Sequence, residues 1–259
     1  MEVRVLSSGS KGNLLHLQAG ETAVLVDCGL SCKQVEARMA KAGLDPRAVS
    51  AILVTHEHTD HIAGVSVFSR RYRVPVYIPH RAWRAVQRWQ NDWWEVRHIR
   101  AGEPLRLNGL CVEPFSIPHD TEEPVAFAFE HGGARFGMAT DLGHASESVV
   151  QALSGMDALL IESNHDERML ETGPYPWPLK QRIASPFGHL SNRQSAALLR
   201  RLLHPALQTV ILGHLSEENN QPELAQAAAQ LVLDEARAEA PLIIAGQYEP
   251  LPPVVVAIK

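Results

Sequence analysis

The stretch Thr55-His56-Glu57-His58-Thr59-Asp60-His61 brings three histidines and an aspartate within seven residues of sequence. The segment just before it, residues 51–54, reads Ala-Ile-Leu-Val and is typical of a short buried strand. A helical pattern follows over residues 62–72, so the cluster occupies the turn at the carboxyl end of a strand, where α/β proteins usually place ligand sites. A lone histidine is more often an ordinary core or surface residue. Three histidines with an aspartate at this spacing instead predict a metal site. The ring nitrogens of His56 and His58 can converge on one ion, and Asp60 and His61 can point at a second.

Three further residues of ligand type each follow a predicted strand. They are His119 after residues 110–117, Asp141 after residues 134–140 and His214 after residues 209–212. Histidine nitrogen and aspartate oxygen are ligands of zinc sites that keep one position open for water. Because the same kind of side chain recurs at separate strand ends, we expect these residues to meet the first cluster at one convergent site.

Four other motifs accompany the hexad H-x-H-x-D-H of residues 56–61. They are Ser7-Ser8-Gly9-Ser10-Lys11-Gly12-Asn13, Leu25-Val26-Asp27-Cys28-Gly29-Leu30, Glu162-Ser163-Asn164-His165-Asp166 and Gly188-His189-Leu190-Ser191-Asn192. The hexad resembles the signature of the metallo-β-lactamase fold superfamily, and the other motifs resemble its YycJ-like (WalJ-like) branch. The hydrophobic pattern alone predicts an α/β protein, whereas the resemblance implies an αββα sandwich of two mixed sheets flanked by helices. We expect residues 1–259 to form a single domain of this fold.

The resemblance also implies a ligand set for two divalent ions. The first ion would be held by His56, His58 and His119, the second by Asp60, His61 and His214, and both by a bridging Asp141. Two such ions share a water molecule and lower its pKa from near 16 to about 7. Nitrogen and oxygen ligands do not select one metal, so zinc is the first choice while manganese and iron remain alternatives. Asp60 is the ligand for which we also expect a catalytic role.

Residues near the start of the chain are candidates for support of this site. Asp27, at the end of the strand over residues 23–27, is expected to orient a metal-ligating histidine. Its alternative role is to cap the helix that starts near Ser31. The loop over residues 7–13 lacks the order of a nucleotide P-loop, and it is either a plain turn or, as the resemblance implies, a substrate-binding loop in which Ser8 and Asn13 contact the ligand.

Two histidines remain beyond the ligand set. His165 and His189 are each expected to protonate a leaving alkoxide or to grip a phosphate, and the alternative for either is an ordinary hydrogen-bonded histidine. His189 precedes a predicted helix, whose N-terminus favours anions. Ser191 is a plausible N-cap of that helix and a candidate substrate contact.

The composition is that of an ordinary soluble globular protein. The chain has 259 residues and a net charge of −5, with 45% hydrophobic and 20% charged residues. No run approaches the ~20 apolar residues of a membrane span, and the start of the chain does not resemble a signal peptide. The three cysteines are expected to be free thiols in a reducing compartment. We therefore expect a cytoplasmic protein with no membrane partner; the sequence does not determine its oligomeric state.

Arginine is distributed unevenly along the chain. Residues 70–106 hold nine arginines against three acidic residues, and residues 180–201 hold five cations and no acid. This asymmetry suits a polyanion that approaches one side, although arginines also coat solvated helix faces. Tryptophans at positions 83, 89, 93 and 94 lie among the arginines. They can clamp nucleic-acid bases, but a tryptophan stripe more often packs in a core or interface.

The remaining elements follow from hydrophobic periodicity and turn residues. Helices are predicted over residues 31–42, 80–94, 146–153, 192–203 and 222–238, a loop over 167–187, and closing strands over 242–244 and 254–258.

These features favour a dinuclear metal-dependent phosphodiesterase, and the resemblance implies an exonuclease that acts on DNA. One alternative is hydrolysis of a small molecule, either a cyclic phosphodiester or a thioester of the glyoxalase II kind. The arginine clusters disfavour the thioester, which needs few cations. A non-catalytic metal-binding scaffold is the third alternative, and the intact ligand set argues against it.

Overall fold

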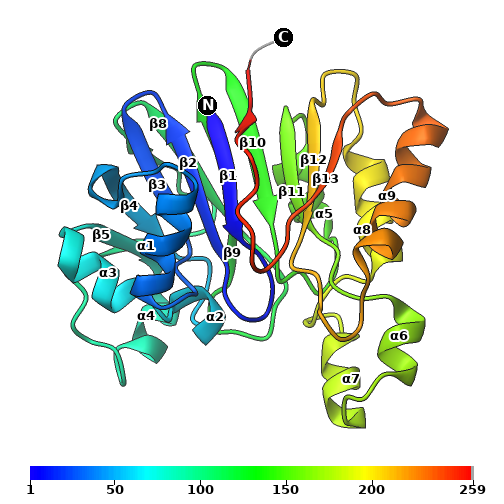
Figure 1. Cartoon of the computed structure of the whole chain (residues 1–259), viewed down its shortest axis with the longest axis horizontal. Helices are drawn as coiled ribbons and strands as arrows, with labels where there is room; N and C mark the ends of the chain where they lie inside the picture. Colours follow the sequence, from blue (N-terminus) through cyan, green and yellow to red (C-terminus); the bar gives the residue numbers. More distant parts are fainter. Residues whose placement is uncertain (258–259) are drawn as a thin grey trace.

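The computed structural model describes residues 1–257 and folds them into two β-sheets that lie face to face, with helices on both outer sides (Figure 1). This arrangement confirms the αββα sandwich. The predicted closing strand forms only at its start, and its last predicted residue, Ile258, lies outside the described residues.

Both sheets are mixed. In the first sheet β3, β4, β5 and β6 run parallel, whereas β14, β1, β2 and β3 pair antiparallel. Its strands, in spatial order, are β14 (Val254–Val255), β1 (Glu2–Ser7), β2 (Leu14–Ala19), β3 (Thr22–Val26), β4 (Val49–Leu53), β5 (Pro75–Pro79) and β6 (Glu95–Ile99).

The second sheet repeats this plan, with an antiparallel block that is followed along the chain by a parallel block. Strands β10 to β13 run parallel, and β7 to β10 pair antiparallel. Its strands, in spatial order, are β13 (Leu242–Ile244), β12 (Thr209–Gly213), β11 (Ala158–Glu162), β10 (Ala134–Ala139), β9 (Val125–His131), β8 (Leu110–Ser116) and β7 (Leu105–Leu107).

Helices cover the outer face of each sheet because the outer faces are also apolar. The helices of the first half are α1 (Cys32–Lys41), the 3₁₀ turn Pro46–Ala48, α2 (Thr59–Ile62), α3 (Val65–Tyr72) and α4 (His80–Val86). Those of the second half are α5 (Glu147–Leu153), α6 (Glu167–Thr172), α7 (Trp177–Ile183), α8 (Asn192–Leu202) and α9 (Pro222–Ala236). No helix among residues 1–257 combines the length and the apolar character that a membrane crossing requires.

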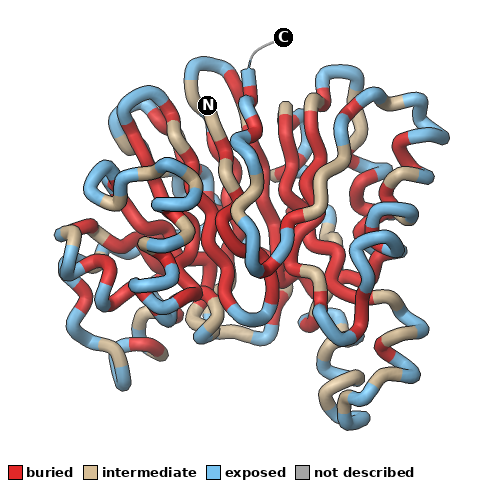
Figure 2. Tube along the Cα trace, in the orientation of Figure 1, coloured by how far each residue is buried: buried red, intermediate tan, exposed pale blue. Residues whose placement is uncertain are grey.

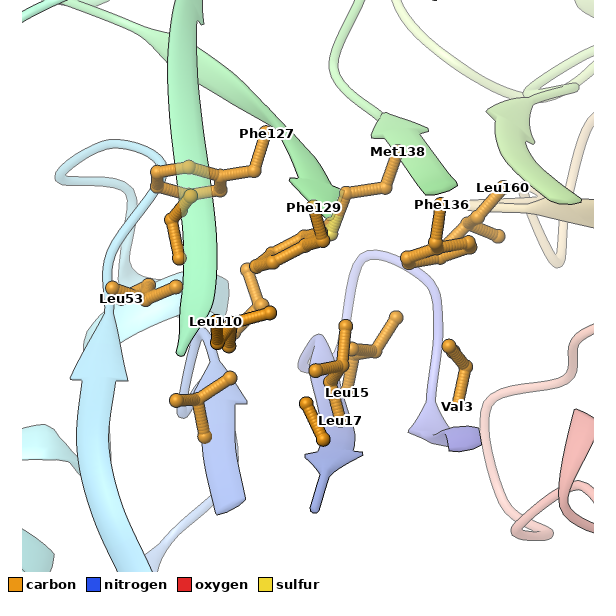
Figure 3. Packing of buried hydrophobic residues seen from close by; sticks show 14 of the residues in the cluster. Val3, Leu15, Leu17, Leu53, Leu110, Phe127, Phe129, Phe136, Met138 and Leu160 are labelled. Atoms are coloured by element: carbon orange, nitrogen blue, oxygen red, sulfur yellow. The ribbon is translucent and has the colours of Figure 1, made fainter. Parts of the chain in front are cut away.

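The central core lies between the two sheets, where both inner faces are buried (Figure 2). Strand β9 shows how the pattern is used, since large and small side chains alternate along it. Phe127 and Phe129 point into the core between the sheets (Figure 3), while Ala126 and Ala128 belong to the cluster under the outer helices. Burying each phenylalanine contributes about 1.5–3 kcal/mol, and the small alanines let the helices approach the sheet.

The helix predicted over residues 80–94 is wrong beyond Val86, where α4 ends. The chain turns back so that Trp93 packs on Trp83, with the ring centroids 4.9 Å apart. The free energy gained by burying Trp93 thus outweighs the helical preference of this segment. Residues 95–99 then form the edge strand β6, whose polar composition hid it from the hydrophobic pattern. Trp89 and Trp94 stay exposed.

The loop predicted over residues 167–187 is also wrong, because α6 and α7 lie within it. Both helices are short and rely on local signals rather than on a long apolar period. Asp166 caps α6 by accepting a hydrogen bond from the backbone N–H of Met169. A proline in the first turn suits the start of α7.

Candidate metal centre

The carboxyl ends of several strands deliver ligating side chains to one end of the sandwich, where α2 lies (Figure 1). There the predicted histidines and aspartates form overlapping groups whose ligand atoms lie within 4.8 Å of one another. The groups contain all seven residues predicted as metal ligands: His56, His58, Asp60, His61, His119, Asp141 and His214.

The first group consists of His56, His58 and His119. The Nε2 of His56 lies 3.2 Å from the Nδ1 of His58, and that Nδ1 lies 3.3 Å from the Nε2 of His119. The outer nitrogens are held by the protein: the Nδ1 of His56 lies 3.0 Å from the hydroxyl of Thr55, and the Nδ1 of His119 lies 3.2 Å from the carbonyl of Gly188. Burial lowers the pKa of all three rings, which favours the neutral form that binds metals.

The second group consists of Asp60, His61 and His214. The Oδ2 of Asp60 lies 3.6 Å from the Nε2 of His61 and 3.9 Å from the Nε2 of His214. Asp27 accepts a hydrogen bond from the Nδ1 of His61 at 2.8 Å and another from the backbone N–H of Thr55. The carboxylate of Asp27 therefore fixes the ring of His61 so that Nε2 faces the centre.

The alternative role of Asp27, as a helix cap, is taken by another residue. Ser31 caps α1 and forms a capping box with Gln34.

Asp141 lies between the two groups. Its Oδ2 is 3.4 Å from the Nε2 of His61, and its Oδ1 is 3.5 Å from the Nε2 of His214 and 3.9 Å from the Nε2 of His119. Within residues 1–257 the Oδ2 of Asp141 and the Nε2 of His214 are buried without a hydrogen-bond partner. Buried polar atoms are rarely left unpaired, so these two atoms fit a cation that would take the place of a partner.

The charge balance also fits a cation. Burial opposes ionisation of Asp141, yet the rings of His214 and His61 hold the pKa of that carboxyl well below its usual value. Burial lowers the pKa of His214, but Asp141 and the other nearby carboxylates outweigh it and raise that pKa to about 10. The carboxylates thus demand positive charge at this point, and divalent ions are the strongest source of it in such sites.

Glu162 is a buried residue at the centre of this site that the sequence reasoning did not single out. Its carboxylate is fully buried and accepts hydrogen bonds from the Nδ1 of both His189 and His214, each at 2.9 Å. It also accepts from the backbone N–H groups of Asp141, Leu142 and Leu190. One carboxylate therefore orients two histidines and fixes two loops. The sequence contained one signal for this residue: an acidic side chain at the end of a predicted buried strand, next to loops that were predicted to form the site.

The backbone at three strand ends is in the left-handed region. The φ angles are 59° at Asp27, 58° at Asp141 and 56° at His214. Aspartate and histidine tolerate this region better than most residues. Such conformations persist where surrounding structure holds them and cluster at functional sites. They turn each side chain from its strand toward the common centre.

The predicted loop residues Ser8 and Asn13 support the ligands directly. The hydroxyl of Ser8 accepts a hydrogen bond from the backbone N–H of His214 at 2.8 Å. The amide Nδ2 of Asn13 lies 3.0 Å from the Nε2 of His61, and its Oδ1 accepts from the N–H of Gly9. Both side chains are buried, and their observed contacts position the site.

A cavity of about 260 Å³ opens onto the two groups of ligands. Its lining combines metal-site residues with one face of α7 and includes His58, Asp60, Asp141, His189, His214, Ser10, Asp120, Tyr175, Leu179 and Arg182. The Nε of Arg182 donates to Asp120 at 2.5 Å, which holds the guanidinium at the cavity. His189 is the predicted proton donor that lies in this lining.

Two predicted residues lie elsewhere. Ser191 is buried and its hydroxyl caps α8, accepting from the N–H of Gln194 and donating to Glu167. His165 is buried and lines a different cavity on the far side of α7. Within the described part of the chain, neither residue lines the metal-site cavity.

The chain is similar to known proteins over most of its length. The family model described as "Beta-lactamase superfamily domain" matches residues 22–214. The exodeoxyribonuclease YycJ of Bacillus anthracis is 39% identical over 233 residues, which cover 89% of this chain and 88% of the relative. The exodeoxyribonuclease WalJ of Streptococcus pneumoniae is 37% identical over 225 residues, covering 85% of this chain and 84% of the relative.

Among solved structures, the metallo-β-lactamase fold protein YhfI of Bacillus subtilis superimposes with a TM-score of 0.73 at 16% identity, covering 96% of this chain and 98% of that protein. This structural likeness shows the fold. The two exodeoxyribonucleases, in contrast, match this chain in sequence over most of their length. The chain belongs to the metallo-β-lactamase fold superfamily and, within it, to the YycJ-like (WalJ-like) branch, as its motifs predicted.

Proposed function

We propose that the protein is a dinuclear metal-dependent phosphodiesterase, acting as an exonuclease on DNA. The observation that carries this proposal is the convergence of seven histidine and aspartate side chains around buried, unpaired ligand atoms. The similarity to two exodeoxyribonucleases supports the choice of substrate.

The ligand set of the proposal is the one given by the resemblance. One ion would be held by His56, His58 and His119, the other by Asp60, His61 and His214, with Asp141 between them. Zinc is the first choice, and manganese and iron also suit nitrogen and oxygen ligands. When bound, two such ions neutralise phosphate charge and make a hydroxide nucleophile available at neutral pH.

The protein's own groups complete the chemistry. His189 lies in the cavity with its Nδ1–H donated to Glu162, so its Nε2 is left for the substrate. When the ring carries a second proton on Nε2, it can pass that proton to the leaving alkoxide and return to the neutral form. Arg182, held by Asp120, presents guanidinium N–H groups to phosphate oxygens. Asp60 contributes a carboxylate to the cavity lining, beside Asp141 and His214.

The distribution of charge favours a polyanion over a small thioester. Arg81, Arg84 and Arg88 line a surface cavity together with Glu122, and Arg84 and Arg88 have no carboxylate partner within residues 1–257. The backbone N–H of Glu122 donates to Glu57 of the hexad, which ties this cationic surface to the metal-site loop. Such a surface suits the phosphates of a strand that extends away from the scissile bond.

The free state of Cys28, Cys32 and Cys111 supports a reducing compartment, and we place the protein in the cytoplasm. We also propose that the chain works as one domain.

A panel of substrates tests the proposed function. Purified protein with zinc or manganese is offered end-labelled single- and double-stranded DNA, RNA, a cyclic phosphodiester and a glutathione thioester at matched concentrations. We expect DNA to be degraded from an end, with kcat/KM at least tenfold above that for any other member. Faster turnover of the thioester or of the cyclic phosphodiester would contradict the proposal. Circular DNA, which has no ends, is the control for internal cleavage.

A further inference from the structure

A second cavity lies behind the wall of the metal site. It has a volume of about 280 Å³ and is lined mainly by apolar surface from Leu170, Trp177 and Ala184. His165 lies in the same lining. The volume is near the lower end of small-ligand sites, which begin at about 300 Å³. No part of the metal chemistry described above uses this cavity.

Helix α7 is the common wall of the two cavities. Leu179, Arg182 and Ile183 line the metal-site cavity, and Trp177, Lys180 and Ala184 line the second one. These two sets occupy opposite faces of a helix with 3.6 residues per turn, so the cavities are separated by one helix thickness, roughly 10 Å. Figure 1 shows α6 and α7 at the same end of the molecule as α2.

His165 carries unused hydrogen-bonding capacity at this cavity. Its residue is only 2% exposed, and within residues 1–257 its Nδ1 is buried without a partner. Its main chain is fixed, because its carbonyl accepts from the N–H of Asn192 at 2.8 Å. Burial lowers the pKa of the ring, so the imidazole stays neutral and offers one donor and one acceptor. Unpaired buried polar groups of this kind call for a partner.

Trp177 supplies an aromatic surface to the same cavity lining. It is 64% exposed, although a large apolar side chain usually gains by burial. A ligand that matches the cavity therefore has a flat face for stacking and a polar edge for the imidazole, which are the two features of a nucleobase.

A phosphate group fits this cavity poorly. The carboxylates of Glu167 and Glu171 border it, and the ammonium of Lys180 already donates to the carbonyl of Glu171 at 2.7 Å. The side chain of Glu167 is engaged by Ser191 and Arg193. The lining therefore selects a neutral aromatic group and leaves the phosphates to the metal side of α7.

We infer that the second cavity binds a nucleobase of the DNA substrate, stacked on Trp177 with its polar edge against the imidazole of His165. The base belongs to a nucleotide beyond the one whose phosphate is cleaved, and α7 lies between them. This inference rests on the proposed nuclease function.

Equilibrium binding of short oligomers tests the inference in the full-length, metal-loaded protein. The probes are a fluorescent five-residue phosphorothioate oligothymidylate, which resists hydrolysis, and an abasic oligomer with the same backbone. We expect the wild type to bind the thymidylate roughly 5- to 150-fold more tightly than the abasic probe, the range of one stacked base. Trp177→Ala should remove most of this difference, and Trp177→Phe should restore much of it.

Leu231→Ala is the matched control, because Leu231 is a large apolar side chain that is 58% exposed on α9, and neither the metal site nor the proposed DNA surface uses it. This variant should keep the preference for the thymidylate. His165→Phe, which keeps a ring but lacks the polar edge, should reduce the preference if it folds. A full preference in Trp177→Ala, or equal binding of both probes by the wild type, overturns the base site while leaving the nuclease proposal in place. Failure of both probes to bind, together with no DNA cleavage, overturns both.

Discussion

Asp141→Asn is expected to lower phosphodiester hydrolysis by more than about 100-fold, the upper end of what loss of a supporting residue around a metal costs. The substitution keeps the size of the side chain but removes the charge that faces His61, His119 and His214. A neutral amide would bind a cation less strongly than a carboxylate and would compensate less positive charge. The rate of cleavage of a generic phosphodiester, bis(p-nitrophenyl) phosphate, measures the effect.

The fold of this variant should persist, because Asp141 contributes no hydrogen bond through Oδ2 within residues 1–257. Asp45→Asn is the control, since Asp45 is an exposed cap of the 3₁₀ turn and belongs to none of the candidate ligand groups. Alanine at Asp60 or His61 should likewise abolish hydrolysis. Unchanged turnover in a folded Asp141→Asn protein would reject the two-metal mechanism.

Glu162 is the residue whose loss should damage both stability and activity. In Glu162→Ala, the backbone N–H groups of Asp141, Leu142 and Leu190 lose their buried acceptor. Each unsatisfied group costs about 1–3 kcal/mol, so we expect the free energy of unfolding to fall by at least about 3 kcal/mol. Urea denaturation of the metal-free protein measures this loss.

Glu162→Gln separates the two roles. The amide keeps a carbonyl acceptor and nearly the same shape, so the loss of stability should be smaller than with alanine. It no longer provides the charge that orients His189 and His214, and metal affinity or activity should fall about 10- to 100-fold. Glu130→Gln, on the exposed end of β9, is the matched control. Wild-type activity in Glu162→Gln would show that the carboxylate only supports the backbone.

The sequence predicted which histidines and aspartates come together, because these residues follow strands that the hydrophobic pattern identifies. The strand ending at Leu53 precedes the hexad, and β12 ends at Gly213, one residue before His214. The end of a buried strand thus fixes the position of each of these residues. The sandwich itself came from the resemblance, since strand order depends on contacts between residues far apart in the chain.

Features that depend on tertiary contacts were missed. Glu162 gains its role only because β11 lies beside β10 and β12, which bring Asp141 and His214 to its carboxylate. The helix after His80 ends early because Trp93 packs on Trp83. His165 follows β11 and was predicted to donate a proton or to grip a phosphate, yet it lines the cavity beyond α7. Sequence neighbours of a site therefore need not face it.

The metal content of the purified protein tests the central claim most directly. Protein loaded with excess zinc or manganese, freed of unbound ions by gel filtration and measured by plasma mass spectrometry, should hold two ions per chain. The Asp45→Asn control should hold the same number, and Asp141→Asn should hold fewer. A fully loaded, folded wild-type protein that retains fewer than two ions per chain would contradict the claim.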